Sequence, residues 1–191
     1  MSPRPDHAAT SRPGPRPGGR SARVQAAVHA AVRDLQATEG RDGLTVPAIA
    51  ARAGVTPSTI YRRWGDLGQL LADVAVEQLR PESTPADMGS YEEDLRAWLE
   101  QYADEMSSTP GRAMLGDLLG TPEPAGAGRC LLFCTQQIDA IRERAGRRGE
   151  RTVPTIDVVD RAVAPIMYRI LFGAEAPGRE DIGRWLALAL R

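Results

Sequence analysis

The chain contains no lysine, two cysteines and two histidines, and none of its 191 residues belongs to a long apolar run. Two cysteines, Cys130 and Cys134, are too few for a disulfide scaffold and have no second pair at metal-ligand spacing, so we expect no metal site. No stretch approaches the roughly 18 apolar residues that cross a bilayer, and the proline-rich N-terminus lacks the apolar segment of a signal peptide. These absences predict a soluble, cytoplasmic protein with no membrane partner.

Residues that could support catalysis are also scarce. Both histidines, His7 and His29, lie in the N-terminal part of the chain, and no nucleophile has a recognisable base partner. No glycine-rich phosphate loop follows a strand either. We therefore expect no enzyme and no cofactor. The spacing of Cys130 and Cys134 would place both thiols on one helix face, which fits either a redox-sensing pair or two buried small apolar side chains.

The net charge of −1 conceals an uneven distribution. Residues 1–64 contain ten arginines and four acidic residues, which is a net charge of +6. Residues 65–191 contain fourteen arginines and twenty-one acidic residues, which is a net charge of −7. A basic N-terminal module on an acidic body would present only one end to DNA.

The first twenty residues are rich in proline, glycine and arginine and have hardly an apolar side chain. We expect residues 1–20 to form a disordered basic arm. Such an arm can follow a minor groove, with Arg12, Arg16 and Arg20 as candidate contacts, or it can serve only as a solubilising tail. A helix over residues 21–39 should come next and support the elements that follow.

Two short helices separated by a turn are predicted after this support. The hydroxyl of Thr45 can cap the first helix, and Pro47 is tolerated in a first turn where no intrahelical donor is needed. Gly54 can adopt the positive φ that reverses a chain between helices. Thr56 and Pro57 then repeat the pattern of cap and first turn. This is the outline of a helix-turn-helix DNA reader, although such pairs also occur as plain packing units.

The second of these helices has a narrow apolar side. Only Ile60 and Trp64, four residues apart, need to face inward. The outward residues carry hydroxyl, phenol and guanidinium groups, which suit a major groove because hydroxyls and phenols donate to phosphates and arginine pairs with guanine. These residues are Ser58, Thr59, Tyr61, Arg62 and Arg63.

Four motifs carry a resemblance to a known family. In chain order they are Gly43-Leu44-Thr45-Val46, Ile49-Ala50-Ala51-Arg52-Ala53-Gly54-Val55, Thr59-Ile60-Tyr61-Arg62-Arg63-Trp64 and Leu70-Leu71. Over residues 21–75 the sequence resembles the N-terminal signature of the TetR/AcrR family of bacterial transcriptional regulators. The resemblance implies a helix-turn-helix DNA-binding domain over residues 21–66 and a helical effector-binding and dimerisation domain over residues 67–191.

The resemblance also implies which residues touch double-stranded operator DNA. Thr45 and Tyr61 would contact phosphates, the start of the second helix would read bases or backbone, and the arginines after Tyr61 would contact bases or phosphates. The predicted set is Thr45, Thr56, Pro57, Ser58, Thr59, Tyr61, Arg62 and Arg63. One departure is that many members have a lysine shortly after the aromatic residue, whereas Trp64 is followed here by Gly65 and Asp66. We expect Asp66 to be the N-cap of the next helix.

The rest of the chain predicts further helices and no strands, so we assign an all-α fold. The expected ranges are about 66–79, 90–106, 112–119, 125–148, 155–172 and 179–190. Proline-containing segments separate several of them. Pro165 should kink or restart the helix over residues 155–172.

Broad apolar stripes on the last two predicted helices indicate a homodimer. Two such helices from each chain would form a four-helix interface, and the resemblance implies dimerisation through these helices. The predicted interface residues are Val159, Val163, Ile166, Ile170, Ile182, Leu186 and Leu190. A monomer that buries both stripes internally is the alternative.

An apolar effector pocket is predicted in the body, because Trp98, Tyr102 and Met106 recur every four residues and can meet side chains of the next helices. The predicted lining is Trp98, Tyr102, Met106, Met114, Leu118 and Phe133, a set that also fits ordinary core. The resemblance implies a repressor that a small lipophilic or aromatic effector releases from its operator by changing the spacing of two recognition helices. A ligand-independent dimeric regulator is the alternative.

Overall fold

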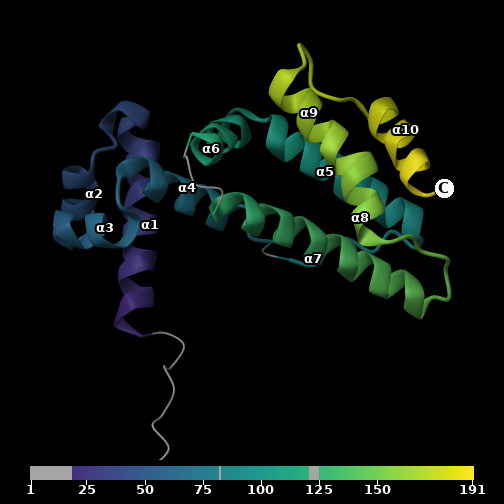
Figure 1. Ribbon diagram of the computed structural model, residues 1–191, viewed down its shortest axis with the longest axis horizontal. Coiled ribbons are helices and arrows are strands. Elements are labelled where there is room, and N and C mark those ends of the chain that lie inside the picture. The colour runs from purple at the N-terminus through teal and green to yellow at the C-terminus, as the bar shows by residue number, and fades with distance from the viewer. Residues whose placement is uncertain (1–18, 82, 121–124) are drawn as a thin grey trace, which may run out of the picture. The chain divides into compact units, whose positions relative to one another are not determined.

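The computed structural model describes residues 19–81, 83–120 and 125–191, and every regular element in these ranges is helical (Figure 1). The predicted all-α class is therefore confirmed. Two compact units divide the chain, Met1–Gly65 and Asp66–Arg191. Within the described ranges, each helix is too short or too polar to cross a membrane.

The described part of the N-terminal unit contains three α-helices and a 3₁₀ turn. They are α1 (Arg20–Glu39), η1 (Arg41–Gly43), α2 (Val46–Ala53) and α3 (Pro57–Trp64). Of the predicted arm, residues 1–18 lie outside the described residues, and Arg20 already belongs to α1. Val28 and Val32 of α1, Ile49 of α2 and Ile60 of α3 are completely buried, so the three helices share a small apolar core.

Helix ends in this unit have identifiable causes. α1 ends at Gly40, whose φ of +73° is strained for any residue with a Cβ. The Thr45 hydroxyl accepts a hydrogen bond from the Ala48 N–H at 3.3 Å, as expected for the N-cap of α2. Arg52 of α2 donates to Asp34 of α1. That pair is about half exposed, so burial of the apolar core contributes more to stability than the ion pair does.

The C-terminal unit is organised around one central helix. Its described elements are α4 (Leu67–Gln78), α5 (Tyr91–Ser107), α6 (Thr109–Leu119), α7 (Ala125–Arg147), α8 (Thr155–Val158), η2 (Val159–Val163), α9 (Ala164–Phe172) and α10 (Arg179–Ala189). α5 contacts α6, α7, α9 and α10, and α4 packs on α6 and α7 (Figure 1). Leu95 and Leu99 of α5 are completely buried at the centre of this core.

α6 begins three residues before its predicted start. Ser108 accepts a hydrogen bond from the Gly111 N–H at 3.1 Å and so caps the helix, while Pro110 lies in the first turn where its missing N–H costs nothing. A Cβ at Gly111 would lie 2.1 Å from the Glu105 carbonyl oxygen, so glycine permits this close approach to the end of α5. The segment read from the sequence as a separator is therefore a helix start.

The predicted irregularity at Pro165 takes the form of a widened helical turn. η2 is a π-helical stretch over Val159–Val163, and α9 resumes at Ala164 with Pro165 in its first turn. Proline has no N–H and its ring crowds the carbonyl of the preceding turn, so a normal α-helical ladder cannot continue through it. A π-helical turn is one recognised way to absorb such an interruption.

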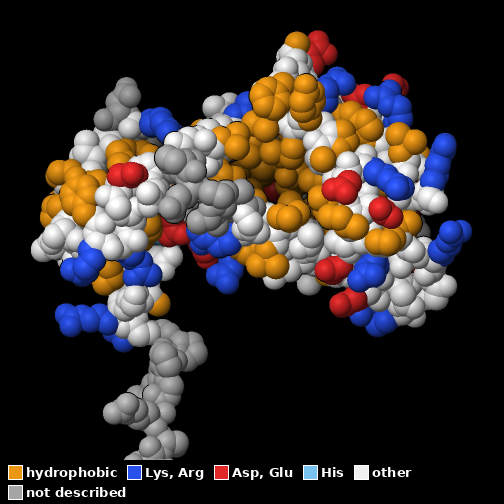
Figure 2. All heavy atoms as spheres, viewed as in Figure 1, with side chains coloured by type: hydrophobic (Ala, Val, Ile, Leu, Met, Phe, Trp, Pro, Cys, Tyr) orange, Lys and Arg blue, Asp and Glu red, His pale blue; other side chains and the backbone are white. Residues whose placement is uncertain are grey.

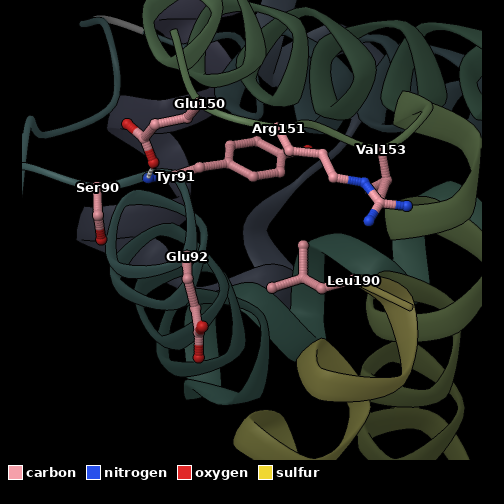
Figure 3. A pocket seen from close by; sticks show the side chains of 7 residues that line it. All are labelled: Ser90, Tyr91, Glu92, Glu150, Arg151, Val153 and Leu190. Atoms are coloured by element: carbon pink, nitrogen blue, oxygen red, sulfur yellow. Dashed lines mark hydrogen bonds between the residues drawn. The ribbon is translucent and has the colours of Figure 1, made fainter. Parts of the chain in front are cut away.

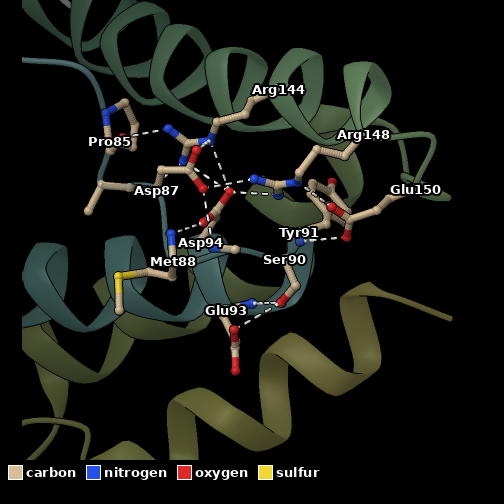
Figure 4. Close-up of polar contacts among 12 residues, drawn as sticks. Pro85, Asp87, Met88, Ser90, Tyr91, Glu93, Asp94, Arg144, Arg148 and Glu150 are labelled. Carbon is tan, nitrogen blue, oxygen red and sulfur yellow. Dashed lines mark hydrogen bonds and ion pairs between the residues drawn. The ribbon is translucent and has the colours of Figure 1, made fainter.

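A buried carboxylate joins the segment before α5 to the end of α7 (Figure 4). The side chain of Asp94 is fully buried and accepts hydrogen bonds from the Met88 N–H at 2.6 Å, Arg144 Nε at 3.0 Å and Arg148 Nη2 at 2.9 Å. Arg144 also donates to the Pro85 carbonyl oxygen at 2.8 Å. Burial raises the pKa of Asp94, but the bonds from Met88, Arg148 and Arg144 outweigh it, and the pKa lies below its ordinary value.

We expect Asp94→Asn to lower the free energy of unfolding by about 3 kcal/mol, because it leaves two partly buried guanidiniums without their shared acceptor. Urea unfolding followed by circular dichroism measures the change. The matched control is Asp87→Asn, since the Asp87 carboxylate pairs with Arg148 at 2.9 Å but is 58% exposed. Asp87→Asn should lower the free energy of unfolding by less than about 1 kcal/mol. Equal losses in the two variants would contradict the role of the buried carboxylate.

The lowered pKa of Asp94 also sets a pH dependence. A carboxyl whose pKa is lower in the folded state stabilises the fold fully above its unfolded pKa of about 3.9, and this contribution disappears as the pH falls through the folded value. Wild-type stability should therefore fall more steeply below about pH 4 than that of Asp94→Asn, which lacks this carboxyl. Parallel stability curves for the two proteins would refute the assignment.

Candidate nucleic-acid interface

The geometry between α2 and α3 exposes most of α3. Gly54 adopts the left-handed conformation with φ +67°, and the Val55 N–H then bonds the Ala50 carbonyl oxygen at 3.0 Å, which closes the turn. Ile60 is completely buried and Trp64 is 6% exposed, as the four-residue spacing predicted. Most of the remaining side chains of α3 therefore lie on the surface of the N-terminal unit.

The exposed face of α3 carries the predicted chemistry. Tyr61 is 51% exposed, Ser58, Arg62 and Arg63 are exposed, and Thr59 is partly exposed. Thr45, Thr56 and Pro57, the other predicted contact residues, are also exposed. Hydroxyl and phenol groups can donate to phosphates, and an arginine can bond both acceptors on a guanine edge. An eight-residue helix with this face has the composition of a major-groove reader.

Thr56 occupies the N-cap of α3, but the predicted capping bond from its side chain is not present. Its Oγ1 instead lies 2.9 Å from Ser58 Oγ and 3.0 Å from Thr59 Oγ1. The Thr59 N–H bonds the Thr56 carbonyl oxygen at 2.9 Å. Three hydroxyls thus form a hydroxyl cluster at the start of α3, and each hydroxyl can either donate or accept.

Arg63 is engaged within the N-terminal unit. Its guanidinium donates to Ser21 and Gln25 of α1, at distances of 2.6 to 3.1 Å. Sequence reasoning missed this contact, because the partners lie 38 to 42 residues away along the chain and no local motif announces them. Of the two adjacent arginines, Arg62 is therefore the better candidate for a direct DNA contact.

Comparisons with known proteins agree with this interface. Residues 28–74 match the family model described as bacterial regulatory proteins, tetR family, and residues 85–189 match the model described as Tetracyclin repressor-like, C-terminal domain. The chain belongs to the TetR family. It is accordingly a DNA-binding transcriptional regulator of the helix-turn-helix type and not an enzyme.

Individual relatives of this TetR-family regulator are moderately similar in sequence. It is 28% identical over 153 residues to the uncharacterized HTH-type transcriptional regulator YdeS of Bacillus subtilis, which covers 76% of this chain and 77% of that protein. It is 38% identical over 56 residues to the uncharacterized HTH-type transcriptional regulator Mb1581 of Mycobacterium bovis, which is 29% of this chain and 28% of that one. The shorter match has the higher sequence identity.

Solved structures share the fold. The TetR family transcription regulator SCO0332 superposes with a TM-score of 0.64 at 26% identity, over 87% of this chain and 96% of that chain. A TetR transcriptional regulator from Agrobacterium tumefaciens superposes with a TM-score of 0.52 at 20% identity, over 87% of this chain and 90% of the other. These two proteins therefore share the helical fold of this chain over most of its length.

The residues predicted to line an effector pocket lie in and around the core of the C-terminal unit. Met106 and Met114 are buried in that core. Trp98 and Tyr102 pack against it with ring centroids 5.4 Å apart. Leu118 and Phe133, the remaining two, are partly buried. Figure 2 shows an apolar hollow on this unit between α6, α7 and α9.

A second concavity lies elsewhere on the C-terminal unit. It is a pocket of about 330 Å³ lined by Ser90, Tyr91, Glu92, Glu150, Arg151, Val153 and Leu190 (Figure 3). None of the six predicted effector residues lines it. Its charged side chains, together with the bond from the Tyr91 N–H to Glu150 at 2.7 Å, give it a polar rim unlike the predicted apolar site.

The two cysteines lie near Tyr102. Burial raises the pKa of Cys134 to about 11, and burial also raises the pKa of Cys130. Burial and the neighbouring Cys134 raise the pKa of Tyr102 as well. All three groups are therefore neutral at physiological pH. Of the two interpretations of the pair, buried small apolar side chains are favoured over reactive thiols.

The predicted dimer interface needs correction. Five of its residues are buried inside the single chain with at most 5% exposure, and they are Val163, Ile166, Ile170, Ile182 and Leu186. The other two, Val159 and Leu190, are partly buried against the same core. α9 and α10 pack on α5, so the five buried side chains stabilise the fold of the single chain and are not available to a partner.

Two substitutions on α3 test the interface. Arg62→Ala should reduce affinity for a preferred duplex by about 1 to 3 kcal/mol and relax sequence preference, because a base contact is lost. Tyr61→Phe should weaken binding to all duplexes alike, because a phenol that donates to phosphate carries no sequence information. Fluorescence anisotropy on a selected and a random duplex measures both effects. Equal loss on the two duplexes for Arg62→Ala would reassign this arginine to phosphate.

Proposed function

We propose that the chain is a homodimeric transcriptional repressor that binds operator DNA in the bacterial cytoplasm and is released by a small lipophilic or aromatic effector. The observation that carries the DNA-binding part is the exposed face of α3, with Tyr61 and Arg62 held outward by the burial of Ile60 and Trp64. A ligand-independent dimeric regulator is the second candidate. It shares the same α3 and differs only in the role of the C-terminal unit.

The outer faces of α8, α9 and α10 support a dimer. Ile156, Tyr168 and Phe172 are 52%, 66% and 72% exposed, and Leu188 of α10 is 45% exposed. Ile156, Asp160, Ala164, Tyr168 and Phe172 fall on one four-residue repeat, which is apolar except for Asp160, and the rings of Tyr168 and Phe172 lie 5.2 Å apart. Exposed aromatic pairs of this kind are more typical of interfaces than of surfaces that stay in water.

A dimer through this face would serve DNA recognition. One recognition helix covers only a few base pairs, and helix-turn-helix proteins usually gain specificity by placing two such helices one DNA turn apart, about 34 to 36 Å. A symmetric contact uses the same patch on both subunits, which a stripe centred on the small Ala164 permits. The stripe therefore replaces the buried residues as the proposed interface.

Effector binding is supported by the arrangement of the C-terminal unit. The apolar hollow of Figure 2 lies between helices that also contact α4, since α6 and α7 both pack on α4. Asp73 of α4 pairs with Arg129 of α7 at 2.6 Å, one residue before Cys130. An effector that moves α6 or α7 would therefore move α4, the helix that follows the DNA-binding unit in the chain. It can do so only in proportion to its preference for the released state.

The experiment that tests the proposed function begins with binding to the DNA that flanks the gene of the protein, compared with a scrambled duplex over a series of salt concentrations. A much higher affinity for the flanking DNA supports an operator binder. Lipophilic compounds are then titrated into the complex of the wild-type protein while the fluorescence anisotropy of a labelled duplex is followed. Release of DNA supports the repressor, whereas a set of compounds that bind nowhere supports the ligand-independent regulator.

The proposed dimer face predicts the behaviour of charged variants. Tyr168→Glu combined with Phe172→Glu should convert dimers to monomers, because two carboxylates per chain would have to be buried. Sedimentation velocity and light scattering measure the mass. Leu131→Glu is the matched control, since Leu131 is 49% exposed on α7 and lies outside the proposed face. A double variant that stays dimeric would place the interface elsewhere.

A further inference from the structure

Arg63, in the last turn of α3, bridges to the beginning of α1. Its Nη1 donates to the Ser21 carbonyl oxygen at 3.1 Å and to Ser21 Oγ at 2.7 Å, and its Nη2 donates to Gln25 Oε1 at 2.6 Å. The Arg63 Cζ lies 5.3 Å from the centre of the Trp64 ring, which is buried. The guanidinium of Arg63 therefore donates to three acceptors on α1 and packs against Trp64 of α3.

The first turn of α1 lacks the usual stabilising features of a helix start within the described residues. Gly19 at the N-cap supplies no side-chain hydrogen bond, and the turn contains no acidic residue. Arg20, Ser21 and Arg23 are exposed, so packing contributes little there. Uncapped helix ends fray, and positive side chains near an N-terminus oppose the helix dipole. The hydrogen bonds from Arg63 thus stabilise the first turn of α1, whose local sequence does not favour a helix start.

The first turn of α1 also carries two arginines, in addition to those of α3. Arg20 and Arg23 are exposed, and they lie within one helical turn of Ser21, which Arg63 holds. Figure 2 shows basic side chains gathered over the start of α1 and beside α3. The bonds of Arg63 to Ser21 thus bring the end of α3 against the turn that carries Arg20 and Arg23.

We propose that Arg63 is a positioning residue for DNA binding. It fixes the first turn of α1 so that Arg20 and Arg23 contact the phosphate backbone, while Arg62 remains the arginine of α3 that touches the duplex. Arg63 would have to abandon three acceptors to bind DNA itself, and cations held in place before binding lose less entropy when the complex forms. The inference rests on the proposed DNA contacts of α3 and extends the contact surface to α1.

A neutral substitution separates positioning from direct contact. Gln25→Ala removes an acceptor of Arg63 but no positive charge, and alanine is favourable in a helix. A direct contact predicts unchanged or higher affinity for Gln25→Ala, because Arg63 is freed. Positioning predicts an affinity loss of about threefold, since a hydrogen bond to a charged group is lost from the clamp. Affinities are measured with the full chain on a duplex selected by the wild-type protein from a random library and on a random duplex.

Salt dependence provides the second readout. Each phosphate contact that is lost lowers the slope of log affinity against log salt by about 0.9. Arg20→Gln with Arg23→Gln should lower the slope by about 2 for each bound subunit, and Arg63→Gln alone should do nearly the same. The triple variant should then lose little more, because the three residues act through one turn. Arg63→Lys keeps the charge but cannot span Ser21 and Gln25, so it should not restore the slope.

Other results would overturn the positioning role. They are additive slope losses in the triple variant, a slope loss of about 1 for each bound subunit in Arg63→Gln with full rescue by Arg63→Lys, or no effect of replacing Arg20 and Arg23. Arg33→Gln is the matched control, because it removes an exposed cation from α1 several turns away. Thermal melts verify that each variant is folded. Failure of the proposed function is distinguishable, since the wild type would then bind both duplexes equally while the slopes still test Arg63.

Discussion

The burial of two side chains, Ile60 and Trp64, is the interaction on which the reading surface of this regulator depends. A helix of eight residues does not persist in water by itself, so α3 exists because these two residues pack into the core of the N-terminal unit. Two anchors at a spacing of four occupy only a narrow stripe, and the rest of the helix surface stays available. Trp64 also lies beside the His29 ring, with centroids 6.1 Å apart, and beneath the guanidinium of Arg63. The same turn of α3 therefore contributes both to the core and to the link with α1.

A different constraint organises the C-terminal unit, where polar groups accompany the apolar core. Leu95 and Leu99 pack at the centre of the core, while Asp94 beside them is a fully buried carboxylate that bonds a backbone N–H and two arginines. A buried carboxylate that accepts three hydrogen bonds tolerates few alternative arrangements, so this cluster fixes how the segment before α5 meets α7. α6 and α7 in turn both pack on α4. Movement within the unit is thus restricted at one end of α7, near Arg144, and coupled to α4 at the other, near Arg129.

Local signals in the sequence predicted most helix ends, because caps and turns depend on neighbouring residues. Thr45, Gly54 and Asp66 behave as their positions indicated. Failures arose where the outcome depends on distant parts of the chain. Periodicity identifies an apolar stripe such as that of Ile166 and Ile170, but it cannot distinguish burial against α5 from burial against a second subunit, and the structure shows the former. The bonds from Arg63 to α1 were likewise invisible, since an arginine beside the recognition motif has the same local pattern whether it faces DNA or another helix.

The hydroxyl cluster of Thr56, Ser58 and Thr59 has a consequence for the kind of DNA that α3 can accept. The hydroxyl protons of this cluster can be redistributed by simple rotation, so the cluster can present a donor to one neighbour and an acceptor to another without any change in the backbone. A base edge that offers either kind of group therefore meets a matching partner. With α3 in the major groove as proposed, we expect operators that differ at the base pairs beneath its start to be bound with similar affinity. The strict part of the recognition should then rest with the planar, donor-only guanidinium of Arg62, one turn further along the helix.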